Sequence, residues 1–128
     1  MKTYVKLGLA LVAGFGLGAS AVHELHAQAS PPAYVISEID EVDESGYSSD
    51  YIPLVKKALA GSGEKRIVSG GNTLAIAGDP PKARVIVSVF ESMDKAQAVF
   101  TSQAYQDAQN VGEKYAKFRT FAVEGSAP

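Results

Sequence analysis

The chain has 128 residues, a formal net charge of −2 at pH 7, no cysteine and two histidines. Nucleic-acid binding calls for a basic stripe, which this weakly acidic sequence lacks. Both histidines, His23 and His26, lie in the N-terminal segment. The rest of the chain therefore cannot form a His-ligated zinc or haem site, a cysteine nucleophile or a histidine-based triad, and we predict no metal site and no cofactor.

Residues 1–29 have the three parts of a secretory signal peptide. Lys2 and Lys6 precede an uncharged, mostly apolar stretch from Leu7 to Val22, and Ala27-Gln28-Ala29 supplies the small residues that signal peptidase reads. The stretch is short of the roughly 20 residues that span a bilayer. We expect cleavage after Ala29 and a periplasmic or secreted domain of residues 30–128. Left uncleaved, the segment would be the protein's attachment to the membrane.

The first half of this domain is predicted to be a strand followed by a helix. Residues 33–40 alternate as a strand does, and residues 40–44 form an acidic loop. Apolar residues then recur at helical spacing from Tyr47 to Leu59, before Gly61. Pro53 should restrict or bend the first turns of that helix, because proline lacks the backbone N–H of a helix interior.

The second half is predicted to contain more strands. Glu64–Ser69 and Asn72–Ala77 are two short strands around Gly70-Gly71, and the β-branched run Arg84–Phe90 is a central strand. Ser92 and Ser102 each cap a helix. A closing strand over Phe118–Val123 completes the order β-α-β-β-α-β. This α+β order is the ferredoxin-like plan, in which two helices cover one face of an antiparallel sheet.

That plan leaves the second face of the sheet bare. We expect this face to carry large apolar groups that are too many to meet water singly: Tyr34, Ile36, Ile86, Phe90 and Phe118. A second copy packed sheet to sheet would cover them. The prediction is a homodimer that encloses a cavity.

The domain resembles the DUF1330 family of uncharacterised proteins. The resemblance rests on PPAYVISEID, the Tyr47–Tyr51–Pro53 helix, Gly70-Gly71, RVIVSVFES, SQAYQ and the final VEG. It implies a dimeric α+β barrel of ferredoxin-like subunits and no established activity. Members commonly carry charged residues where this chain has Ser69 and Gln109, so the resemblance also implies a more neutral cleft here.

Three tyrosines, Tyr34, Tyr47 and Tyr51, are the predicted ligand-binding residues. A tyrosine offers a large apolar body and one polar group, which suits the orientation of a small ligand. The alternative is that tyrosines four residues apart simply pack the helix on the sheet.

Glu38 is the candidate catalytic residue. A carboxylate on the barrel face with a raised pKa could act as a general base. The alternative is an ion pair with Arg84 or Arg119 on a neighbouring strand. The acidic residues at 40–44 do not have the spacing of a calcium loop, so they add no metal site.

The sequence leaves three functions open. The first is binding of a small, mostly apolar molecule in a cavity between two barrel halves. The second is a cofactor-independent isomerase- or monooxygenase-like enzyme that uses glutamate and tyrosine as acid–base groups. The third is a purely structural dimer of the cell envelope. The fold alone does not decide among them.

Overall fold

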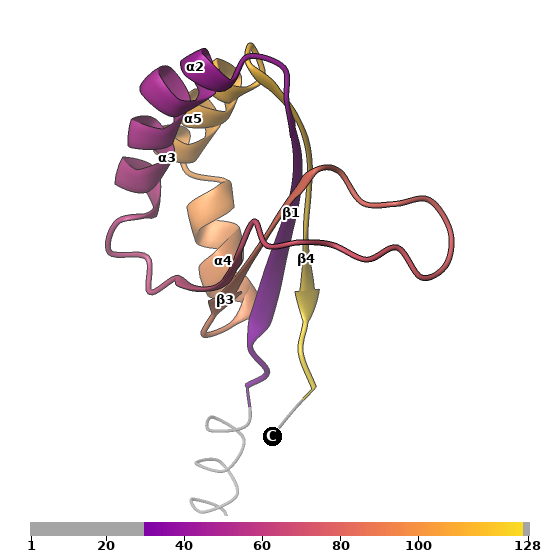
Figure 1. Cartoon of the computed structure of the whole chain (residues 1–128). Helices are drawn as coiled ribbons and strands as arrows, with labels where there is room; N and C mark the ends of the chain where they lie inside the picture. Colours follow the sequence, from indigo (N-terminus) through magenta and orange to yellow (C-terminus); the bar gives the residue numbers. More distant parts are fainter. Residues whose placement is uncertain (1–29, 127–128) are drawn as a thin grey trace, which may run out of the picture. The chain divides into compact units, whose positions relative to one another are not determined.

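The computed structural model describes residues 30–126, so the predicted signal peptide lies outside the described residues. The chain folds as one four-stranded antiparallel sheet in the order β2-β3-β1-β4, with its helices on one side (Figure 1). The elements are β1 (Ala33–Glu41), α2 (Glu44–Gly46), the π-helical turn η1 (Tyr47–Tyr51), α3 (Ile52–Leu59), β2 (Lys65–Ser69), β3 (Arg84–Phe90), α4 (Met93–Phe100), α5 (Gln103–Gly112) and β4 (Ala116–Glu124). This order and strand arrangement confirm the ferredoxin-like plan, and β3 is an interior strand as its β-branched sequence predicts.

Short polar side chains start the helices. Ser92 Oγ accepts a hydrogen bond from the Lys95 N–H at the start of α4, and Ser102 Oγ accepts one from Tyr105 N–H at the start of α5. Both predicted caps are therefore confirmed. The first helical segment begins earlier than predicted, because Asp43 caps α2 and draws Glu44 out of the acidic loop. Pro53 lies in the first turn of α3, directly after the π-helical turn η1, so the irregular turn adjoins the proline as the sequence suggests.

The core lies between the helices and one face of the sheet, here called the helix side. Odd-numbered residues of β1 point to it, and Val35 and Ile39 are buried there. The register pairs Ser37 with Ile86 and Ala33 with Phe90, so the even-numbered residues of β3 share this side. Ile86, Phe90 and Phe118 therefore pack toward the helices, and the prediction that they lie on the bare face is wrong.

The opposite face, here called the open face, still carries apolar residues. Tyr34 and Ile36 lie on it as predicted, opposite Val87 and Val89 of β3. On β4, Phe121 pairs with Ile36 and Val123 with Tyr34, and these two side chains are 41% and 47% exposed. Within residues 30–126 no segment covers this end of the face.

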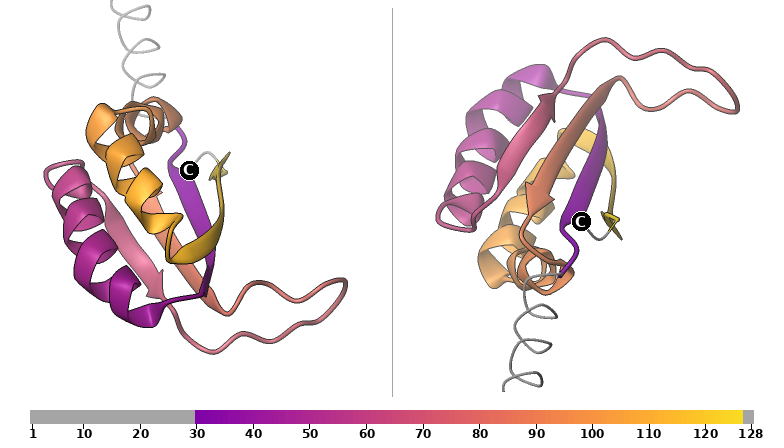
Figure 2. Two further views of the ribbon diagram at one scale, coloured as in Figure 1. Left: turned by 90° about the horizontal axis from the view of Figure 1, so that it is seen from above. Right: turned by 90° about the horizontal axis from the view of Figure 1, so that it is seen from below.

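The predicted strand at Asn72–Ala77 is absent. Residues 70–83 instead form an extended connection between β2 and β3, here called the arm, which projects from the sheet on the side away from the helices (Figures 1 and 2). Its ends are tied down: Gly70 N–H donates to the Val85 carbonyl at 2.8 Å, and Ala83 N–H donates to Asp40 Oδ1 at 2.8 Å. The predicted hairpin with Asn72–Ala77 does not form because its other strand, β2, pairs with β3 instead.

Two features are absent from the described residues. No helix among residues 30–126 is long and apolar enough to span a bilayer. The same stretch holds no group of three or more histidine, cysteine, aspartate or glutamate side chains placed to hold a metal ion.

Candidate functional site

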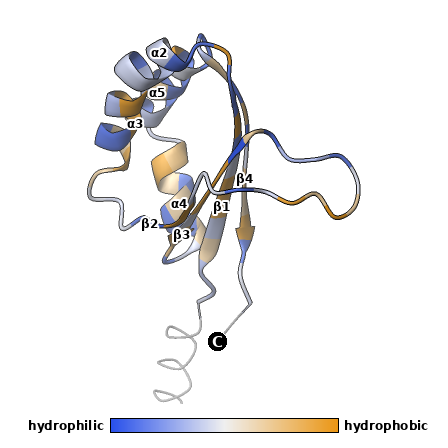
Figure 3. Cartoon of the chain, viewed as in Figure 1, coloured by the Kyte–Doolittle hydropathy of each residue, from blue (hydrophilic) through white to orange (hydrophobic). Residues whose placement is uncertain are grey.

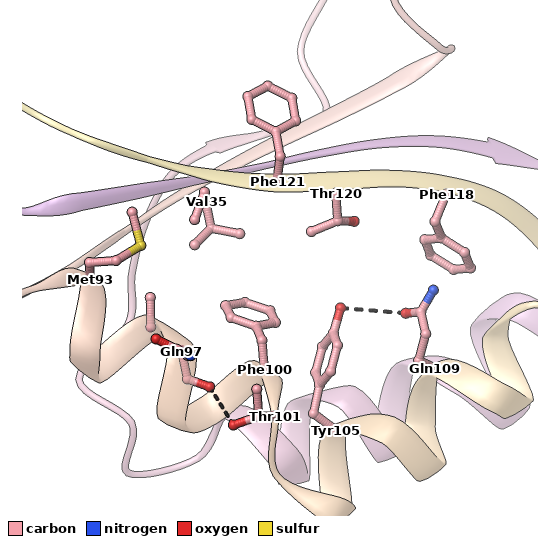
Figure 4. Close-up of a pocket in the computed structure, with 12 residues that line it drawn as sticks. Val35, Met93, Gln97, Phe100, Thr101, Tyr105, Gln109, Phe118, Thr120 and Phe121 are labelled. Carbon is pink, nitrogen blue, oxygen red and sulfur yellow. Dashed lines mark hydrogen bonds between the residues drawn. The ribbon is translucent and has the colours of Figure 1, made fainter.

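A cavity of about 490 Å³ lies on the helix side, between β4 and β1 of the sheet and helices α4 and α5 (Figure 4). Its position follows from the fold. Helices α3 and α5 pack against each other, and a space remains between the helices and the outer strand β4. Twelve residues line it: Val35, Met93, Ala96, Gln97, Phe100, Thr101, Tyr105, Gln109, Phe118, Thr120, Phe121 and Ala122. Figure 4 shows Phe121 pointing to the far side of β4, whereas Thr120 and Phe118 point toward the helices.

Aromatic rings form one wall of this cavity. Phe100 packs edge-on against Tyr105, with ring centroids 4.6 Å apart, and edge-on against Phe90 at 5.6 Å. Phe90 is fully buried and fixes Phe100 from behind. The wall is thus an apolar surface, continued by Val35 and Met93.

The polar groups of the cavity are few and uncharged. Tyr105 Oη donates a long hydrogen bond of 3.4 Å to Gln109 Oε1, and Thr101 Oγ1 donates one of 2.7 Å to the Gln97 carbonyl (Figure 4). Burial raises the pKa of Tyr105 to about 12, so its hydroxyl stays protonated near neutrality. The lining contains no carboxylate, lysine or arginine. It offers apolar contact and hydrogen bonds, without a group that exchanges protons near pH 7.

Tyr47 and Tyr51 lie in the core beside this cavity and do not line it. Their ring centroids are 5.1 Å apart, and Tyr51 packs on Phe118 at 5.3 Å. Burial raises the pKa of both hydroxyls. Only a narrow space of about 70 Å³ adjoins them. Their arrangement matches the alternative interpretation, in which tyrosines four residues apart pack a helix on the sheet.

Glu38 and Tyr34 lie on the open face, so the sheet separates them from the cavity. Arg119 Nη1 donates to Glu38 Oε2 at 2.6 Å, and Lys82 N–H donates to Oε1 at 3.1 Å. The alternative ion pair with Arg119 is therefore present, whereas Arg84 lies 3.7 Å from Glu41. The Tyr34 ring lies against Gly125, where an added Cβ would come within 2.6 Å of it. The four sequence candidates do not form one site.

A shallower hollow of about 510 Å³ lies on the open face. It is bounded by Glu38, Arg119, Ile36 and Val85 from the sheet and by arm residues such as Leu74 and Pro80. The helix-side cavity is lined by two helices and two strands, whereas the arm that bounds this hollow is itself exposed, Leu74 by 83%. We therefore take the helix-side cavity as the candidate site.

The sequence places the chain in a known family. Residues 32–126 match the family described as "Domain of unknown function (DUF1330)". The chain belongs to this family. The search of curated proteins found no match.

Solved structures similar to this DUF1330 chain share its fold at low identity. A protein of unknown function from Rhodopseudomonas palustris is 14% identical with a TM-score of 0.52, over 82% of this chain and 94% of that one. A candidate antibiotic biosynthesis monooxygenase from Caulobacter crescentus is 12% identical with a TM-score of 0.50, over 80% and 97%. A Bacteroides thetaiotaomicron protein of unknown function, with an oxidoreductase activity suggested, is 13% identical with a TM-score of 0.50, over 76% and 100%. These likenesses establish the ferredoxin-like fold.

Sequence reasoning on this DUF1330 chain missed the residues that line the cavity. Neither Tyr105 nor Phe100 was among the predicted site residues. Their common signal is the Ser102 cap between them, which breaks the helix and turns both rings toward the same space. Gln109 stands where the resemblance implies a charged residue in other members. That difference was the clearer sequence sign of an uncharged cavity.

Proposed function

We propose that this DUF1330 protein binds a small, mostly apolar, uncharged molecule in the helix-side cavity. The observation that supports it is the cavity's volume of about 490 Å³ together with its uncharged lining. Ligand pockets commonly measure ~300–1,000 Å³ and combine apolar walls with a few polar groups. A charged ligand would lose its hydration there without meeting an opposite charge.

The Tyr105 hydroxyl is the group we expect to orient the ligand. Its hydrogen bond to Gln109 is long at 3.4 Å, so exchanging it for a bond to the ligand loses little. Because the phenol stays protonated, it can donate to a carbonyl or hydroxyl oxygen. The ligand class is therefore an apolar ring system with one oxygen.

The enzymatic alternative would place its substrate elsewhere. Acid–base chemistry by Glu38 and Tyr34 requires a substrate on the open face, where both Glu38 carboxylate oxygens already accept hydrogen bonds from Arg119 and Lys82. Each carboxylate oxygen keeps a second lone pair, so a substrate would have to share Glu38 with Arg119 and with the Lys82 N–H. The geometry favours binding over this mechanism.

The binding test uses the fluorescence of N-phenylnaphthylamine, a neutral aromatic probe. Ala122→Phe places a ring in the cavity from β4, and we expect the probe to bind about tenfold more weakly, equivalent to ~1.4 kcal/mol. Ala104→Phe is the matched control, since this exposed residue of α5 is not among the lining residues. Equal binding by Ala122→Phe and the unmodified chain would refute the site.

The polar contact is tested with two matched probes, naphthol and naphthalene. The unmodified protein should prefer naphthol, and Tyr105→Phe should remove about 1 kcal/mol of that preference, the usual contribution of one neutral hydrogen bond. Naphthalene affinity should not change. A preference that survives in Tyr105→Phe would assign the contact to another group.

We further propose that the protein is exported and acts as a homodimer. Export is supported by the signal-peptide pattern of residues 1–29, and N-terminal sequencing of the mature protein should begin at Ser30. Recovery of mature protein that retains Lys2 would contradict cleavage.

Dimerisation is supported by the exposed Phe121 and Val123 on the open face. Sedimentation at micromolar concentration should give twice the monomer mass, and a stable monomer would refute it.

A further inference from the structure

We propose that the arm of one chain pairs as an added β-strand with the outer edge of β4 in a second copy. The inference rests on the proposed homodimer and specifies how its two copies hold each other. It follows from an unpaired extended segment and an unpaired strand edge that occur in the same molecule.

The arm supplies the first half of this pair. Residues 71–83 form no backbone–backbone hydrogen bond with other described residues, although the segment is extended. Leu74 and Ile76 are 83% and 89% exposed, and Figure 3 colours this part of the arm hydrophobic. From Gly70 to Gly78 the sequence contains no charged residue. An uncharged extended segment with free N–H and C=O groups is a template for strand pairing.

The edge of β4 supplies the second half. β4 is one of the two outer strands of the sheet and pairs only with β1, in a regular register from Ala33–Glu124 to Glu41–Ala116. Its second half, Thr120–Val123, carries no charge and no proline, two of the devices that usually protect an edge. Phe121 and Val123 expose apolar surface beside this edge. Leu74 and Ile76 would pack on such residues.

The geometry of the fold makes a second copy the partner. The arm projects on the open-face side of the sheet, opposite the helices (Figures 1 and 2). Two stacked sheets lie about 10 Å apart, and six extended residues span about 20 Å, so the segment from Asn72 to Ala77 is long enough to reach a sheet packed on the open face. Each copy then gives one arm and receives one, which closes a two-fold symmetric dimer.

Cysteine cross-linking tests the pairing directly, because the natural chain contains no cysteine. One chain carries a single cysteine in the arm, at Ala75 or Ile76. A second chain with a different tag carries a single cysteine in β4, and the four positions are Thr120, Phe121, Ala122 and Val123. The two full chains are co-expressed and oxidised, and mass spectrometry counts disulfides between unlike chains. Lys57→Cys, on the exposed surface of α3, replaces the β4 variant as the matched control.

We expect mixed disulfides with β4 well above the Lys57 control, strongest at alternate β4 positions because successive side chains of a strand point to opposite faces. A dimer in sedimentation without any mixed disulfide above the control would overturn the arm pairing and leave the proposed dimer standing. A monomer would overturn both.

A second variant tests the apolar contacts of the arm. Leu74→Asp with Ile76→Asp should weaken dimerisation at least about tenfold in sedimentation. The fold should survive, because neither side chain is buried in the single chain. Thr73→Asp is the control for added charge alone and should have the smaller effect. Unchanged dimerisation in the double variant would refute the proposal.

Discussion

The two faces of the sheet are built from alternate residues of the same strands, yet they have different surroundings. On the helix side Phe90 is 1% exposed, and the core clusters surround Ile39 and Val35. On the open face Phe121 is 41% exposed, while an ion pair of Glu38 with Arg119 occupies the other end. The helix side therefore supplies the stability of the single chain and its cavity. The open face is available for association.

The largest test of this contrast compares two phenylalanines. Phe90→Ala should lose about 3–5 kcal/mol of unfolding free energy, because it leaves a cavity in the buried core. Phe121→Ala, the same change on the open face, should lose much less when both are measured by urea unfolding at a concentration too low for association. Similar losses would show that the open face is packed within the single chain.

A second test compares the effect on stability of replacing a glycine in the core and a glycine in the arm. A Cβ on Gly112 would lie 2.5 Å from the Tyr51 ring, so Gly112→Ala should cost about 1–3 kcal/mol although alanine favours helix. Gly71→Ala in the arm meets open space and should stay within about 0.5 kcal/mol. Urea unfolding of both variants gives the comparison. A stabilised Gly112→Ala would mean that α5 does not press on Tyr51.

Much of the fold was predictable because local chemistry determines it. The caps at Ser92 and Ser102 satisfy N–H groups of their own helices, and the β-branched run of β3 favours an interior strand. The sheet face on which Ile86, Phe90 and Phe118 lie was predicted wrongly. A shift of one residue in strand register moves every side chain of a strand to the opposite face. The sequence of one strand does not contain that register.

The candidate site was less predictable than the fold. Its lining comes from β1, α4, α5 and β4, and the space arises where helices α4 and α5 stand away from an outer strand. No spacing along the chain indicates such a gap. The predicted tyrosines were reasonable by residue type, yet the helix that carries Tyr47 and Tyr51 packs them into the core.

A smaller effect is expected at the ion pair of the open face. Glu38→Gln keeps an acceptor for the Lys82 N–H and removes the charge that faces Arg119. The Arg119 side chain is 68% exposed and that of Glu38 only 9%, so solvent screens the arginine end of the pair, and we expect a loss of about 1–2 kcal/mol that shrinks with added salt. Glu113→Gln, an exposed glutamate of the loop after α5, is the control. A loss of several kcal/mol would show that the open face contributes to the stability of the single chain.

The smallest effect on stability at neutral pH belongs to Tyr105→Phe, and in alkali this variant should gain stability relative to the unmodified chain. Burial raises the pKa of Tyr105 to about 12, above the usual value near 10 of an unfolded chain. The folded state therefore keeps a proton that the unfolded state releases, so this contribution to stability is complete below about pH 10 and is lost as the pH rises toward about 12. Tyr105→Phe has no such proton, and its stability should fall less between about pH 8 and about pH 11 than that of the unmodified chain. Ultraviolet titration of the phenols should also lose one group that ionises near pH 12. A variant that keeps the full alkaline loss would show that the Tyr105 hydroxyl is solvated, and the cavity would then lack the dry, neutral donor on which the proposed ligand contact depends.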